Sequence, residues 1–406
     1  MLPTLFVLLF VAVGFGVLFA LVRSREMERW IVPYLAQVPK HRRAAAARGD
    51  VHLLIGIVDH YEPGHDATSP EHAQSRVDRW VEEYPKLFGR FRDRDDRPPR
   101  HTFCYPIEQY VPGHLDALAS LCRAGFGEVE IHLHHDRDTS ANLRKTLNEA
   151  KAIFSDRYGL LSRRRSGEVA YGFVHGNWCL DNSRPDGRWC GVNDEIDVLV
   201  ETGCYADFTM PSGGPCQTRT INAIYYAIDD PERPFSHDQG PRVGSGTPPD
   251  SGLMMIPGPL VLNWRNRKWG LFPRIEDGCV QASQPATIER VDDWIRAGVS
   301  VPNRPDWIFV KLHTHGAYEA GQAALLGPTM VAFHEALAAR TASDSRFHVH
   351  YVTAREMYNL AKAAEAGFAG SVAEARDYEL IWHGGFSTET STESVADRRS
   401  ESGGLP

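Results

Sequence analysis

The sequence predicts an α/β fold, and two observations lead to that prediction. Short apolar runs of strand length recur along the chain, and segments with helical periodicity lie between several of them. Strands alternating with helices over about 310 residues are typical of a parallel sheet or of a (β/α) barrel. We favour the barrel.

The expected strands are the apolar runs at residues 51–58, 102–105, 128–134, 168–174, 205–209, 254–262, 307–312 and 347–352. The expected helices are the periodic segments at residues 71–91, 113–124, 140–154, 194–202, 287–297, 328–339 and 354–366. Residues 229–252 are rich in Pro, Gly, Asp and Ser and contain no apolar run, so they predict a long surface loop that is either a lid or mobile decoration.

The ends of the chain differ from this body. Residues 2–22 carry no charge, and as a helix they rise roughly 31 Å, which matches the hydrocarbon core of a bilayer. A signal peptide is the alternative, but no Lys or Arg precedes the run and no A-x-A-like site follows it. We therefore expect a transmembrane anchor over residues 1–22, a juxtamembrane linker over 23–49, the barrel domain over 50–370 and a largely disordered tail over 371–406.

This anchor predicts a single-pass protein of the cytoplasmic (inner) membrane. Arg23, Arg25 and Arg29 follow the apolar run and no basic residue precedes it, which favours a cytoplasmic body. Seven cysteines, odd in number and without a C-x-x-C pair, indicate neither a disulfide framework nor a cysteine zinc cluster. A net charge of −8 argues against nucleic acid as a partner. The conspicuous feature is the 18 histidines.

Many of these histidines stand at the carboxyl ends of the expected strands, where the chemistry of a (β/α) barrel gathers. The strand ends carry Asp59, His60 and Glu62, then His132 and His134, then His175, Asn177 and Trp178, then Asp207, and finally His313 and His315.

Alternate residues of a strand point to one face, so His132 and His134 project together. Two imidazoles on one face suit a divalent metal, although a hydrogen-bonded pair of buried histidines has the same pattern. With Asp59 and His60 at another strand end, we expect a zinc site formed by Asp59, His60, His132 and His134. Which of His132, His134, His135 and Asp136 coordinate stays open.

The remaining polar residues are expected to act on the substrate. Asp59 is a candidate metal ligand or general base, and His313 or His315 is the candidate acid for the leaving group. The candidate substrate contacts are Glu62, His175, Asn177, Trp178 and Asp207. A Trp at such a rim is typical of a sugar-stacking platform, although a core Trp is equally consistent.

The order of several motifs resembles the polysaccharide deacetylase (NodB-homology, carbohydrate esterase family 4-like) superfamily over about residues 50–365. The motifs are Val58-Asp59-His60, Ile131-His132-Leu133-His134, Val174-His175-Gly176-Asn177-Trp178, Ala206-Asp207 and Val310-Lys311-Leu312-His313. The resemblance implies a distorted barrel of seven or so strands, a divalent metal, and removal of acetyl groups from N-acetylated sugars. It also implies that Asp59 is the base, that His313 is the acid, and that the body lies outside the cytoplasmic membrane, so the face of the membrane stays undecided.

The chain departs from the family pattern at three positions. His60 stands where the resemblance implies a second Asp, and His175 stands where it implies an Arg. The family's pair of histidines four residues apart corresponds here to His132 and Asp136.

Together these features predict a membrane-anchored, metal-dependent hydrolase that removes acetyl groups from N-acetylated or O-acetylated polysaccharide, in envelope or exopolysaccharide metabolism. Its expected partners are a polysaccharide or oligosaccharide substrate, the membrane through residues 2–22, and polysaccharide-assembly proteins. One alternative is a non-catalytic barrel that binds glycan or scaffolds a polysaccharide assembly. The other is a glycoside hydrolase that pairs Asp59 or Glu62 with Asp207.

Overall fold

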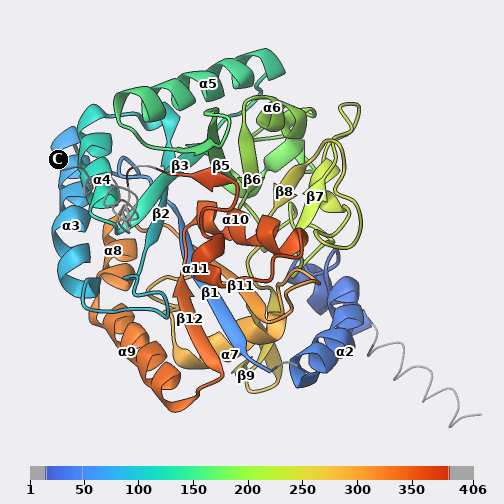
Figure 1. Cartoon of the computed structure of the whole chain (residues 1–406). Coiled ribbons are helices and arrows are strands. Elements are labelled where there is room, and N and C mark those ends of the chain that lie inside the picture. The colour runs from blue at the N-terminus through green and yellow to red at the C-terminus, as the bar shows by residue number, and fades with distance from the viewer. Residues whose placement is uncertain (1–13, 15, 48, 383, 385–406) are drawn as a thin grey trace, which may run out of the picture.

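The strand β1, Val51–His60, lies at the centre of the fold (Figure 1). The computed structural model describes residues 14, 16–47, 49–382 and 384. Strand β1 pairs in parallel with β11, Trp307–Thr314, along almost its whole length. Its first half also pairs with β12, Phe347–Tyr351, and its second half pairs with β2, His101–Pro106. Segments from both ends of the body therefore meet on one strand.

The main sheet of the described chain has 11 strands, and its principal path is β11-β1-β2-β3-β5-β6-β8-β7. The strands not yet placed are β3 (Gly127–Leu133), β5 (Val169–His175), β6 (Cys204–Asp207), β7 (Tyr225–Ala227) and β8 (Leu253–Met255), with β4 (Ser162–Arg164) and β13 (Leu380–Ile381) beside β5. The hairpin β9 (Val261–Lys268) and β10 (Phe272–Glu276) forms a separate sheet.

The prediction of a distorted (β/α) barrel of seven or so strands is wrong, because the observed sheet has 11 strands and does not close within the described residues. Strands β11 and β7 end the path and do not pair with each other within the described residues, and β7 runs antiparallel to β8. The reason lies in the sequence between β6 and β11, which supplies a long loop and a hairpin in place of repeated βα units. Pro257 and Pro259 also divide the expected strand 254–262 into β8 and β9, because proline cannot donate to a strand ladder.

Each of the other expected strands and helices has a counterpart. The long helices are α3 (Pro70–Phe88), α4 (Pro112–Arg123), α5 (Ser140–Ala152), α6 (Glu195–Glu201), α7 (Ile288–Ala297), α9 (Pro328–Ser343) and α10 (Ala354–Glu365). The structure adds α2 (Ile31–Ala47), α8 (Glu319–Leu325) and α11 (Val372–Ala375).

Apolar side chains cover both faces of the sheet. Along β1, Leu53 and Ile55 belong to one core and Leu54 and Val58 to the other, as strand alternation requires. Figure 1 shows α3, α4, α5 and α9 around the outside and α10 across the middle. At Gly56 a Cβ would collide with the carbonyl oxygen of Val352, so glycine permits this close approach of the chain to β1.

The expected membrane anchor is corrected by the structure. Residues 1–13 and 15 of the expected anchor 1–22 lie outside the described residues. Among the residues that are described, no helix combines the length and the apolar character that crossing a bilayer requires. For the expected single-pass anchor in the cytoplasmic membrane, the described part of the chain thus provides no spanning helix.

Both segments that we expected to flank the body contribute to it. Trp30, in the expected linker, is only 1% exposed, and the Arg29 guanidinium lies 3.0 Å from Asp238. In the expected tail, α11 and β13 are ordered elements of the fold. Residues 383 and 385–406 of that tail lie outside the described part of the chain.

Candidate metal centre

The carboxyl ends of β1 and β3 bring together residues that are far apart in the sequence. His60 is the last residue of β1, Glu62 follows it by two positions, and His132 lies at the end of β3. These parallel strands are separated only by β2, so their carboxyl ends lie at the same edge of the sheet. Sheet topology therefore places the three side chains close together.

His60, Glu62 and His132 form a compact group, which we call the candidate metal centre. Each offers one ligand atom within 4.8 Å of the others, and all three are buried. His132 Nε2 lies 3.2 Å from Glu62 Oε1, and the His60 and His132 ring centroids are 4.8 Å apart. Two imidazoles and one carboxylate are a donor set that divalent metals accept in proteins.

A backbone carbonyl fixes the orientation of the His132 ring. Its Nδ1 donates to the Val174 carbonyl at 2.7 Å, so in the neutral ring Nε2 carries a lone pair. That lone pair faces Glu62 Oε1, itself an acceptor. Two acceptors at this distance need a proton or a cation between them. A backbone carbonyl that fixes the tautomer is a usual companion of metal-binding histidines.

Three further side chains flank the centre. His134 Nε2 lies 3.6 Å from Glu62 Oε1, and its Nδ1 lies 2.6 Å from Glu108 Oε1. The His315 ring lies 4.9 Å from that of His60 and the Trp178 ring 5.1 Å, both between centroids. His134, His315 and Trp178 are partly exposed, so the buried centre is approached from this side.

The surroundings separate the pKa values of these groups. Burial would raise the pKa of Glu62, but the hydrogen bond and charge of His132, with the charges of His134 and His315, lower it overall. Burial would lower the pKa of His134, yet Glu108 and Glu62 raise it above its ordinary value. Burial is the main reason why the pKa of His315 is lowered. The pKa values of His134 and His315 are thus shifted in opposite directions, as in active sites where one group acts as an acid and another as a base.

Asp59 lies on the other side of β1 from His60. Its Oδ2 lies 2.9 Å from His101 Nε2, and its Oδ1 accepts the Gly316 N–H at 2.7 Å. Asp59 is fully buried, and it is not part of the group formed by His60, Glu62 and His132. The structure therefore gives Asp59 a positioning contact with the segment after β11 in place of the expected ligand and base positions.

His313 also lies in the protein interior. It is buried, its Nδ1 makes no hydrogen bond to described residues, and its backbone pairs with Gly278 and Val280. Burial, with the charge of Lys311, holds the pKa of His313 well below its usual range. His313 is not a member of the group formed by His60, Glu62 and His132, and its role as the acid stays a prediction.

The expected substrate contacts fall into different places. Glu62 lies in the centre itself and Trp178 lies against it. Asn177 is partly exposed and accepts from the Cys179 thiol through its carbonyl at 3.0 Å. Asp207 is buried and accepts two hydrogen bonds from Thr209, at 2.9 and 2.7 Å. Both carboxylate oxygens of Asp207 are therefore engaged by Thr209 in the protein interior.

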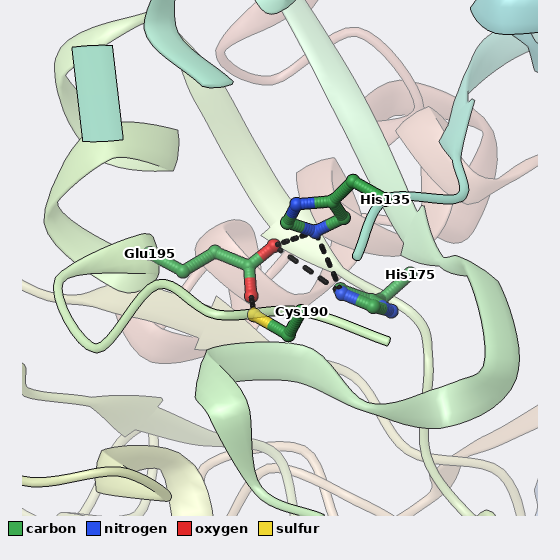
Figure 2. A group of neighbouring side chains, drawn as sticks. All are labelled: His135, His175, Cys190 and Glu195. Carbon is green, nitrogen blue, oxygen red and sulfur yellow. Dashed lines mark hydrogen bonds and ion pairs between the residues drawn. The ribbon is translucent and has the colours of Figure 1, made fainter. Parts of the chain in front are cut away.

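Of the four residues left open as ligands, His132 lies in the centre and His134 lies beside it. Asp136 Oδ1 accepts the Trp189 N–H at 2.5 Å. His135 turns away from the centre and meets the fully buried His175 (Figure 2). The sequence predicted His175 as a substrate contact, and its burial removes it from any surface that a substrate reaches.

Sequence reasoning missed Glu108, His101, Cys190 and Glu195. Glu108 follows the end of β2 by two residues, in a single helical turn, so its place at a strand end was a signal that could have found it. His101 begins β2, and Cys190 has no C-x-x-C partner to signal it. His101, Cys190 and Glu195 therefore become visible only when the chain is folded.

Groups of metal-ligating side chains occur at several places in the described chain. Besides the candidate metal centre, they are His135 with His175, Cys190 and Glu195; Asp50 with His52 and His348; and Asp93 with Asp95 and His350. In the last group Arg376 pairs with both carboxylates, at 3.0 and 2.7 Å, which already compensates their charge.

Comparison of the chain with protein-family models, with curated proteins and with solved structures finds no match.

Proposed function

We propose that the protein is a metal-dependent hydrolase that removes acetyl groups from a glycan, with zinc at the candidate metal centre. The observation that carries this proposal is the buried group of His60, Glu62 and His132, in which the Val174 carbonyl turns His132 Nε2 toward Glu62. The motif order that resembles the polysaccharide deacetylase superfamily supports an acetylated sugar as the substrate.

The donor set favours zinc over magnesium or calcium. Imidazole nitrogen suits zinc, whereas magnesium and calcium take mainly oxygen ligands. A zinc ion held by His60, Glu62 and His132 would polarise a substrate carbonyl and lower the pKa of a water molecule from about 15.7 to about 7.

His134 and His315 are placed to handle protons in such a reaction. Glu108 holds Nδ1 of His134 at 2.6 Å, which leaves Nε2 pointing toward Glu62 and the centre. His315 lies against His60 from another strand end, with no ring hydrogen bond to described residues that would tie up its nitrogens. The two imidazoles therefore flank the centre, and either can hold or release a proton beside it.

Trp178 supplies an apolar surface beside these polar groups. Its indole lies 5.1 Å from the His60 ring and 5.8 Å from the His315 ring, between centroids. The face of an indole packs well against the C–H face of a sugar ring. Such a contact would orient an acetylated sugar toward the centre.

The first test replaces a ligand of the centre. In the full chain, His132→Ala should abolish the metal at the centre and lower acetate release from N-acetylglucosamine oligomers by more than roughly 100-fold. Even the loss of a residue that only orients a metal ligand costs roughly 10- to 100-fold. His72→Ala is the matched control, because His72 pairs with Glu319 outside the centre. Elemental analysis and an acetate assay provide the two readouts.

Two results would contradict the proposal at different levels. Undiminished metal content in His132→Ala would remove the metal assignment. A fully metallated wild-type chain that releases no acetate from N- or O-acetylated oligosaccharides would remove the deacetylase. Oligosaccharide binding by that inactive chain would then favour the non-catalytic glycan-binding alternative.

A further inference from the structure

A second group of ligating side chains lies at the far side of the β3 end. It consists of His135, His175, Cys190 and Glu195, which we call the buried cluster (Figure 2). His135 follows β3, His175 ends β5, Cys190 lies in the loop after β5 and Glu195 begins α6. One ligand atom from each lies within 4.8 Å of the other three.

The atoms of the buried cluster converge on one point. His135 Nε2 and His175 Nε2 are 2.9 Å apart, and they lie 3.3 and 3.6 Å from Glu195 Oε1. Cys190 Sγ lies 3.3 Å from the other oxygen of Glu195. Figure 2 shows both rings and the carboxylate facing this point.

Both imidazoles turn their Nδ1 outward. His135 Nδ1 lies 3.1 Å from Asp138 Oδ2, and His175 Nδ1 contacts the Gly176 carbonyl. A carboxylate and a carbonyl can only accept, so each Nδ1 carries the hydrogen. In the neutral rings the two Nε2 lone pairs then point at each other, an arrangement that a shared cation makes favourable.

Glu195 gives an independent sign of a missing partner. Its carboxylate is fully buried, and Oε1 makes no hydrogen bond to any described residue. Oε2 accepts from the Asp181 N–H at 2.5 Å, but no Lys or Arg of the described chain pairs with this carboxylate. A buried, ionised carboxyl group needs a compensating positive charge.

We propose that the buried cluster is a second metal site, closed and structural, which binds a zinc-class cation through His135 Nε2, His175 Nε2, Glu195 and Cys190 Sγ. Four donors of nitrogen, sulfur and oxygen match the tetrahedral coordination of structural zinc. Burial of Cys190, His175 and Glu195 leaves no open position for a substrate, in contrast to the candidate metal centre.

The proposed ion would hold the loop between β5 and α6. This loop carries Trp178, and five of its non-glycine residues have positive φ angles: Asn177, Trp178, Asp181, Asn182 and Trp189. Such a conformation is costly and persists only when the surroundings fix it. The second site would thus keep Trp178 in place against His60 without touching the substrate.

The test uses cobalt(II) as a spectroscopic substitute for zinc in the full chain. The wild type should show sulfur-to-cobalt charge-transfer absorption, because one ligand is a thiolate. Cys190→Ser should abolish that absorption, whereas Cys279→Ser, at a cysteine outside the buried cluster, should keep it. His132→Ala should also keep it, because it removes only the ion of the candidate metal centre.

A second measurement covers variants that fold poorly. Glu195→Gln keeps the side-chain volume and should lower the metal content relative to wild type. Treatment with a chelator should lower the melting temperature of His132→Ala, which retains only the structural ion, and should change that of His132→Ala/Glu195→Gln far less. Absence of the thiolate absorption in the cobalt-loaded wild type, or equal metal content in Glu195→Gln and wild type, would overturn the proposal in favour of a histidine pair that shares a proton.

Discussion

At the scale of single residues, side chains that are adjacent in the sequence contact different parts of the structure. Asp59 and His60 are adjacent in β1, yet Asp59 faces His101 and Gly316, and His60 faces the candidate metal centre. His134 and His135 divide in the same way between the two groups of ligating residues. Within β1 strand alternation is the cause, because each step along an extended chain reverses the side chain. His134 and His135 lie just after the end of β3.

Because Asp59 contacts His101 and Gly316, we predict that it contributes to stability and does not bind the metal. In Asp59→Asn one of the two donors, His101 or the Gly316 N–H, faces an amide hydrogen. We expect the free energy of unfolding to fall by about 1–3 kcal/mol, the usual cost of an unsatisfied buried polar group. The metal content of the centre should not change, because Asp59 is not one of its ligands. Urea unfolding and elemental analysis of the same sample test both statements; loss of the ion with unchanged stability would restore Asp59 as a ligand.

At the scale of elements, the junction between β5 and the following loop lies between the candidate metal centre and the buried cluster. Gly176 lies there, and a Cβ at this position would collide with the His134 ring and the Leu133 carbonyl. The backbone of the loop therefore approaches β3 as closely as it can. The candidate metal centre lies on one side of this contact and the buried cluster on the other.

Gly176→Ala should consequently displace His134. We expect a loss of stability of about 1–3 kcal/mol, typical of overpacking, and a fall in acetate release with folding preserved. Gly246→Ala is the matched control, because a Cβ there meets nothing within 4 Å. Circular dichroism, thermal melting and the acetate assay distinguish the two variants. Equal behaviour of both would show that the contact at Gly176 is unimportant.

The helices and strands could largely be predicted from the sequence, whereas the order of the strands in the sheet could not. Apolar periodicity located β1, β3, β5 and β11 to within a few residues. The barrel was wrong because local patterns do not reveal which strand lies beside which. Pro257 and Pro259 already indicated in the sequence that the expected strand 254–262 is interrupted.

The candidate site was predictable in the same partial way. Placing His60, His132 and Glu62 near one sheet edge followed from strand ends, and the structure brings these three together. Glu108, two residues after the end of β2, could have been found in the same way. His101 and Glu195 come from a strand start and a helix start. Their proximity depends on long-range packing, for which a single sequence has no local signal.

At the scale of the whole molecule, several ionisable groups are buried inside the sheet. Asp207 is 1% exposed, and burial raises its pKa from 3.8 to about 7 despite hydrogen bonds from Thr209 and the charge of Lys311. The folded protein thus binds a proton at Asp207 more tightly than the unfolded chain does. The stability that this proton contributes is present below about pH 4 and is lost as the pH rises through about 7.

Asp207→Asn should remove this pH dependence. Between about pH 4 and pH 8 the wild type should lose up to about 4 kcal/mol of unfolding free energy relative to the variant, since one pKa unit corresponds to about 1.4 kcal/mol. Urea denaturation curves at several pH values for both proteins give the difference directly. A difference that stays constant with pH would show that folding does not raise the pKa of Asp207.

The pairing of β1 also determines when the chain can finish folding. β1 is among the first strands to leave the ribosome, whereas its partners β11 and β12 are among the last. The Gly316 N–H that bonds to Asp59 lies 257 residues later in the chain. Contacts over such separations slow folding. During synthesis β1 therefore remains an apolar segment without its final neighbours, open to aggregation or to chaperones. Truncation before β11 should yield an insoluble product, although His60, Glu62 and His132 are all present in it.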